Sequence, residues 1–201
     1  MPLKERGLTM GKIRDLATTV TAFKLNWIKG VEVYNKAVQY AKHNYIPSSP
    51  LYKETIEKYE NQFAAEKKAA VAKCTAEINA VFEDARGQVK KVVTDLPTGK
   101  DRAIIDMLRA GNLFPEETEI LAEQVRNTYF GNKEVSAILK EEFIPVGSVI
   151  KTLDNAEKQT VRALGYIMAD PDSPTAGAIT KGEYLGEIED KVTAFVSQYK
   201  K

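Results

Sequence analysis

Apolar residues recur along the first part of the chain at steps of three and four, the spacing that places side chains on one face of an α-helix. The pattern predicts a helix about 42 Å long that ends before Pro47, because proline cannot continue it. Gly30 lies inside this helix, so we expect a kink or a close contact there. The apolar positions are Ile13, Leu16, Val20, Phe23, Trp27, Val31, Tyr34, Val38 and Ala41.

A second apolar pattern runs from Tyr52 to Leu96 and stops at Pro97. It predicts a helix about 65 Å long, preceded by Ser49 as N-cap and by Pro50 at its first position. The linker between the two helices is short, which makes them antiparallel neighbours. We therefore expect Trp27 and Phe63 at contacts between them.

The second helix is longer than the first, so its far part, from Ile78 to Leu96, needs another cover. Leaving its valines and leucine in water would forfeit about 6 to 12 kcal/mol. The cover could be the short helices after Pro97, the final helix, or a second subunit. Together with Trp27 and Phe63, the predicted interface residues are Val81, Val89, Val92 and Leu96 of the second helix and Leu185, Ile188, Val192 and Phe195 of the final helix.

Beyond Pro97 the pattern changes to shorter helices separated by glycine and proline. Thr180 and Glu183 are spaced like a capping box for the last of them. The predicted segments are helices near 101–110, 115–130, 135–143 and 148–169, an exposed loop at 170–177, and a final helix through Tyr199.

These elements define an all-α fold: a long antiparallel helical hairpin, similar to a coiled coil, followed by a smaller bundle of short helices and a C-terminal amphipathic helix. We place an N-terminal hairpin at 1–97 and a short-helix region at 98–201. The second region is expected to pack on the hairpin or on a neighbouring subunit.

Composition indicates a folded, water-soluble chain, since 43% of its 201 residues are hydrophobic and 28% are charged. The longest apolar run, Leu164 to Ala169, is too short to cross a membrane, and no secretory signal is expected. Cys74 is the single cysteine, which favours a small core residue in a reducing compartment. We therefore expect a cytoplasmic protein, or one that forms part of a viral particle.

Charge is divided unevenly along the chain. Residues 1–100 carry a net charge of +6 and residues 101–201 a net charge of −5, although the whole chain is only +1. Opposite charges of this kind can hold two parts of one chain together or align neighbouring copies head to tail. We expect a homo-oligomer or a larger protein assembly.

The sequence motifs that would indicate catalysis or the binding of a ligand or metal are incomplete. Gly99-Lys100 has neither the first glycine nor the Ser or Thr of a phosphate-binding loop, and Pro174 occupies a ligand position of the calcium loop that Asp170 would begin. His43 is the only histidine, and its place at a helix C-terminus favours an interaction with the helix dipole. We therefore predict that the protein is not an enzyme and that it has no catalytic residues, no metal-binding residues and no cofactor.

Nucleic-acid binding is a weaker alternative. The segment 116–143 could form a helix-turn-helix, but its second helix, 133–142, is acidic and poorly suited to phosphates. Cations near the N-terminus, at Lys4, Arg6, Lys12 and Arg14, are diluted by acids.

The sequence thus favours a non-enzymatic structural or assembly protein, a helical subunit of a larger complex and most concretely a component of a virus-like or bacteriophage particle. The alternative is a regulatory or inhibitory helical module that binds a protein or a nucleic acid.

Overall fold

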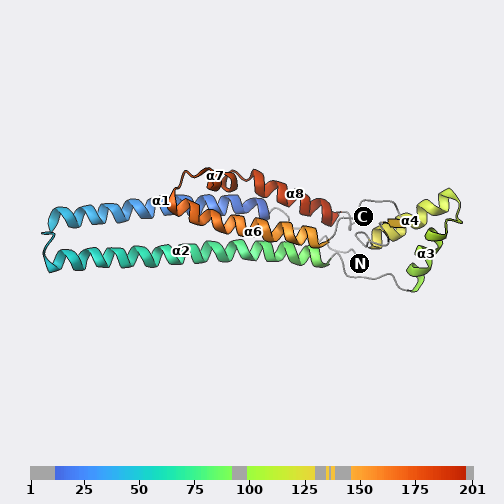
Figure 1. Cartoon of the computed structure of the whole chain (residues 1–201), viewed down its shortest axis with the longest axis horizontal. Helices are drawn as coiled ribbons and strands as arrows, with labels where there is room; N and C mark the ends of the chain where they lie inside the picture. The colour runs from blue at the N-terminus through green and yellow to red at the C-terminus, as the bar shows by residue number, and fades with distance from the viewer. Residues whose placement is uncertain (1–11, 92–98, 130–134, 136, 139–145, 198–201) are drawn as a thin grey trace, which may run out of the picture. The chain divides into compact units, whose positions relative to one another are not determined.

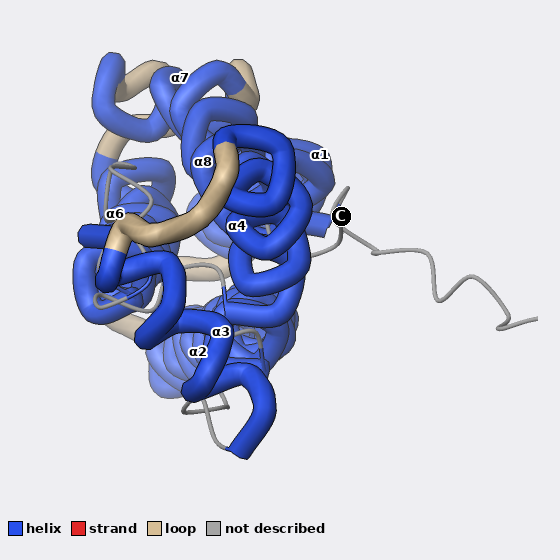
Figure 2. The backbone as a smooth tube through the Cα atoms, turned by 90° about the vertical axis from the view of Figure 1, so that its right-hand side faces the viewer, coloured by secondary structure: helices blue, strands red, loops and turns tan. Residues whose placement is uncertain are grey.

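The computed structural model describes residues 12–91, 99–129, 135, 137–138 and 146–197. These residues are 91% helical and include no strand, which confirms the all-α fold class (Figure 2). They divide into two compact units, and each unit combines segments from both halves of the chain. The predicted boundary at residue 97 lies outside the described residues.

The hairpin forms the larger part of the unit that comprises Gly11–Val81 and Glu157–Gly186. Helix α1 (Lys12–Asn44) and helix α2, which begins at Pro50 and continues to Lys91, run side by side in opposite directions (Figure 1). The backbone N–H of Tyr52 donates to Ser49 Oγ at 3.1 Å, which confirms Ser49 as the N-cap of α2.

Aromatic contacts hold the two helices of the hairpin together. The ring of Phe63 on α2 lies between two rings of α1, 5.4 Å from Trp27 and 4.8 Å from Tyr34. The Lys67 ammonium lies 5.5 Å from the centre of the Trp27 ring, within range of a cation–π interaction. Gly30 faces Phe63 in the same layer, but a Cβ atom at this position would be at an ordinary van der Waals distance from the ring, so the packing does not require a glycine.

Two further helices complete this unit: the second part of α6 (Val146–Ala169) and α7 (Pro174–Thr180). Helix α7 packs on α1 (Figure 1), and the Lys24 ammonium donates to Asp172 just before it, at 3.0 Å. The buried side chains of this unit include Leu16, Val20 and Phe23 of α1, Cys74 and Ile78 of α2, Leu164 and Ile167 of α6, and Ile179 of α7.

Helix α7 corrects the predicted loop at 170–177. Pro174 begins a helix because its fixed φ suits the first helical position, and Ile179 buries an apolar side chain. Thr180 is therefore not the cap of the final helix: its hydroxyl donates to the Gly177 carbonyl at 3.2 Å, at the end of α7. Gly182, with φ +78°, makes the turn into α8 (Glu183–Ser197).

The other unit contains the end of α2, α3 (Gly99–Ala110), α4 (Pro115–Tyr129), the start of α6 and the end of α8. Gly111, with φ +69°, follows the last residue of α3, in agreement with the helix predicted near 101–110. Helices α3 and α4 pack around a small core of Ile104, Ile105, Val125 and Val135, flanked by Leu108, Leu121 and Ile138. Most of the predicted helix 135–143 lies outside the described residues.

An ion pair joins α2 to α6 in this unit. The Arg86 guanidinium donates to Asp154 on α6 and to Glu83 on its own helix, both at 3.0 Å. Arg86 is buried, and of its two partners the Asp154 side chain is 44% exposed and the Glu83 side chain 70%, so Asp154 provides the more sheltered contact.

Candidate interaction surface

The hairpin beyond Lys24 is a two-helix arm, which we define as residues 25–63. Met168, near the end of α6, reaches α2 at the level of Ala64 to Ala72, and Asp172 pairs with Lys24 on α1. Further towards the loop, Figure 1 shows α1 and α2 with no third described helix of the same unit beside them. The faces of the arm that point away from the α1–α2 contact are therefore exposed.

Large apolar side chains occupy one of these faces. Leu25, Val33 and Tyr40 on α1 are 54%, 67% and 58% exposed. They are separated by eight and seven residues, which places them on one stripe, opposite to the side of α1 that carries Trp27 and Tyr34. The apolar character continues around the loop, where Ile46 and Leu51 are also exposed. Sequence reasoning missed this stripe because it followed only the stronger apolar face.

A second exposed apolar group lies on α4. Phe114, which precedes the helix, is 75% exposed and Ile120 is 67% exposed. Sequence reasoning placed Ile120 among the apolar residues of the helix that begins at Pro115 and did not single out Phe114. The side that packs on α3 instead carries Leu121, Ala122 and Val125, so Ile120 points to the opposite face.

The predicted interface residues have different surroundings. Trp27, Phe63 and Val81 are half-buried, whereas Val89 has no exposed surface in the single chain. The Arg86–Asp154 pair, three residues from Val89, places α6 beside this part of α2. Leu185, Ile188, Val192 and Phe195 are buried as well. Val92 and Leu96 lie outside the described residues.

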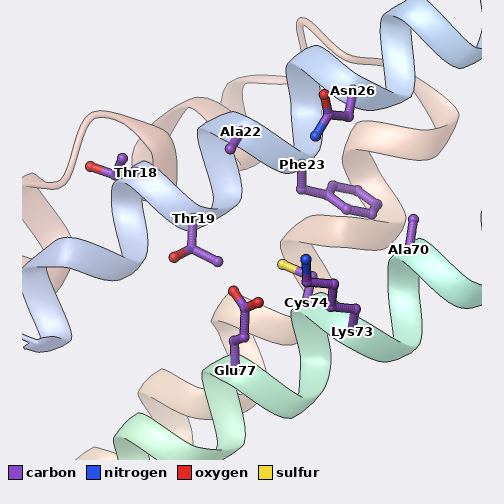
Figure 3. A pocket seen from close by; sticks show the side chains of 9 residues that line it. All are labelled: Thr18, Thr19, Ala22, Phe23, Asn26, Ala70, Lys73, Cys74 and Glu77. Atoms are coloured by element: carbon purple, nitrogen blue, oxygen red, sulfur yellow. The ribbon is translucent and has the colours of Figure 1, made fainter.

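A groove of about 320 Å³ opens between α1 and α2 on the hairpin. Figure 3 shows Cys74 and Glu77 of α2 pointing towards Phe23 and Thr19 of α1. The other residues of the lining are Thr18, Ala22, Asn26, Ala70 and Lys73.

The thiol in this groove is poorly suited to nucleophilic chemistry. Burial, with a smaller contribution from the negative charge of Glu77, raises the pKa of Cys74 to about 11. The thiolate is the nucleophilic form of cysteine, so this side chain stays protonated near neutral pH. Cys74 is 5% exposed and lies in the core of the hairpin, in accordance with its role as a small core residue.

No group of three or more His, Cys, Asp or Glu side chains with metal-site geometry occurs among the described residues. His43 is exposed in the last turn of α1. Within the same described ranges, no helix combines the length and hydrophobicity needed to cross a bilayer. Comparisons with protein-family models, curated proteins and solved structures found no match to this chain.

Proposed function

We propose that this chain is a non-enzymatic structural or assembly protein, a helical subunit of a larger complex and most concretely a component of a virus-like or bacteriophage particle. One observation carries the proposal. The two-helix arm keeps Leu25, Val33 and Tyr40 in water on one stripe, where an isolated protein would gain from covering them. Several large apolar side chains exposed on one face of an ordered element are consistent with a protein–protein contact.

The opposite net charges of the two halves support the same proposal. A basic half and an acidic half favour an ordered head-to-tail arrangement of copies over a random one. Repeated contacts between unlike surfaces produce rings, shells or filaments, which are the forms that particle components adopt.

The mass of the purified protein in solution tests this function. Light scattering coupled to size exclusion, over a broad range of concentration, should show a mass that rises above that of one chain. Negative-stain electron microscopy should then show rings, shells or filaments of regular dimensions. A mass equal to one chain at every concentration, with no regular particles, would contradict the proposal.

A further inference from the structure

The exposed stripe on α1 carries charge as well as apolar groups. Lys29 and Lys36 are exposed and fall between the apolar positions, so the stripe reads Leu25, Lys29, Val33, Lys36 and Tyr40 at steps of four, four, three and four. Successive helical residues differ by about 100°, so these five side chains lie within a sector of about 80°. We call this stripe the basic face of α1. Glu32 is exposed beside it, and the two lysines leave the face net positive.

The exposed face of α4 has the opposite charge. Glu116 and Glu123 lie four residues before and three residues after Ile120, on the same side of the helix, and both are exposed. Glu117 accepts a hydrogen bond from the Phe114 backbone N–H at 3.2 Å, and the Phe114 side chain is itself exposed. The sequence contains no lysine or arginine from 112 to 125. We call Phe114, Glu116, Glu117, Ile120 and Glu123 the acidic face of α4.

The two faces match in pattern and are opposite in charge. The basic face covers sixteen residues from Leu25 to Tyr40, about 22 Å, and the acidic face, which covers ten residues from Phe114 to Glu123, is long enough to cover roughly half of it. Each face presents large apolar side chains flanked by charges of a single predominant sign. Apolar burial supplies attraction at such a contact, while charge complementarity selects the partner and its orientation.

We propose that the basic face of α1 in one copy of this chain docks on the acidic face of α4 in a second copy. The inference rests on the proposed assembly function and names the surfaces that carry it. Because the two faces differ, the contact is heterologous, and every added copy presents a new basic face and a new acidic face. The assembly therefore grows head to tail until it closes into a ring or extends as a filament.

Charge reversal on each face provides the test. The variant Lys29→Glu with Lys36→Glu should weaken self-association at least about tenfold, measured as the concentration at half-association by sedimentation velocity. The variant Glu116→Lys with Glu123→Lys should do the same. All four positions are exposed, so circular dichroism should show unchanged helicity.

Mixing the two variants gives the decisive measurement. In the mixture, the reversed α1 of one variant meets the reversed α4 of the other, and the remaining faces form the natural pair. Association should therefore return to within about threefold of the natural protein in the mixture but not in either variant alone. As a matched control, Lys53→Glu with Lys58→Glu reverses two exposed lysines of α2 on the same arm and should leave association unchanged.

Three outcomes would overturn the inference. If the natural chain self-associates and both reversals leave its association intact, assembly uses other surfaces and only this inference fails. If both reversals weaken association but the mixture does not restore it, the two faces do not contact each other. If the natural chain is monomeric and instead binds anionic vesicles through Lys29 and Lys36, the basic face meets a membrane surface, and the assembly function fails with the inference.

Discussion

Gly30 on α1 faces the ring of Phe63 on α2: a Cβ atom built on Gly30 would be 3.7 Å from Phe63 Cε2. That distance is an ordinary van der Waals contact, so the ring leaves room for a methyl group. Gly30→Ala should therefore stabilise the protein by about 0.5 to 1 kcal/mol, because glycine in a helix interior is that much less favourable than alanine. Urea unfolding followed by circular dichroism measures the change.

Gly182→Ala is the contrasting variant. Gly182 has φ +78°, and a Cβ atom there would lie 3.2 Å from Ala17 Cβ, so both the backbone and the packing oppose a side chain. This substitution should destabilise the protein by more than about 1 kcal/mol. If Gly30→Ala were destabilising to a similar degree, the space between Gly30 and the Phe63 ring would be too small for a methyl group.

Removal of the Asp154 carboxylate should destabilise the protein measurably. Asp154 accepts from the buried guanidinium of Arg86 at 3.0 Å, and a hydrogen bond to a charged group contributes about 1.5 to 3 kcal/mol. Asp154 is partly exposed, so we expect Asp154→Ala to lower the free energy of unfolding by about 1 to 2 kcal/mol.

Asp106→Ala is the matched control for that substitution. Asp106 also pairs with arginines on its own helix, Arg102 at 3.6 Å and Arg109 at 3.5 Å, but all three side chains are about half exposed, whereas Arg86 in the Asp154 pair is buried. Its effect on unfolding should stay below about 0.5 kcal/mol. Equal effects of the two substitutions in the same urea titration would show that the α2–α6 pair contributes no more than a surface pair.

The Cys74 thiol should react slowly in the folded protein. Its pKa of about 11 compares with a value of 9.0 for the exposed group, which lowers the thiolate fraction near neutral pH about hundredfold. Labelling with a thiol-specific disulfide reagent should be at least that much slower in buffer than in denaturant. A native rate equal to the denatured rate would mean that the groove between α1 and α2 opens freely.

The same pKa makes stability depend on pH in a defined range. A pKa that is raised in the folded state contributes fully to stability below about pH 9, where the thiol is protonated in both states. That contribution is lost as the pH rises towards about 11, because the unfolded chain releases the proton first. The difference in stability between the natural protein and Cys74→Ala should therefore shrink across this range.

Substitution by aspartate should affect folding strongly at a buried valine and weakly at an exposed one. Val89 has no exposed surface, so Val89→Asp buries an uncompensated charge and should abolish cooperative folding of its unit. Val33 is 67% exposed, and Val33→Asp should change stability by less than about 0.5 kcal/mol. The circular dichroism signal at 222 nm, followed during urea unfolding, measures the helix content and the stability of both variants. A folded Val89→Asp variant would mean that this part of α2 has no apolar cover.

The long helices could be predicted from the sequence because each has one apolar face whose spacing of three and four residues indicates a helix over its whole length. Ser49 and Pro50 fix the start of α2 through local chemistry alone, and Gly111 fixes the end of α3 in the same way. The short helix α7 could not be predicted because proline and glycine occur in loops as well as at helix starts. Only the tertiary burial of Ile179 selects the helix there.

The candidate surface was harder to predict than the fold. Val31 and Val33 are chemically identical and two residues apart, yet only Val33 is more than half exposed. Which of two apolar faces of α1 remains in water depends on the positions of α2, α6 and α7, and periodicity within α1 does not contain that information. Val89 illustrates the reverse case, since its burial was expected but the helix that covers it was not specified.

The composition of the hairpin unit also determines when it can fold during synthesis. Its segments Gly11–Val81 and Glu157–Gly186 are separated along the chain by a long stretch that belongs to the other unit. The ribosome therefore releases α1 and α2 well before Leu164 and Ile167 are made, so Val20 and Ile78, which are buried in the same unit, cannot yet be covered by the whole of that unit. During that interval the nascent hairpin offers a binding site to chaperones and to the hairpins of neighbouring nascent chains.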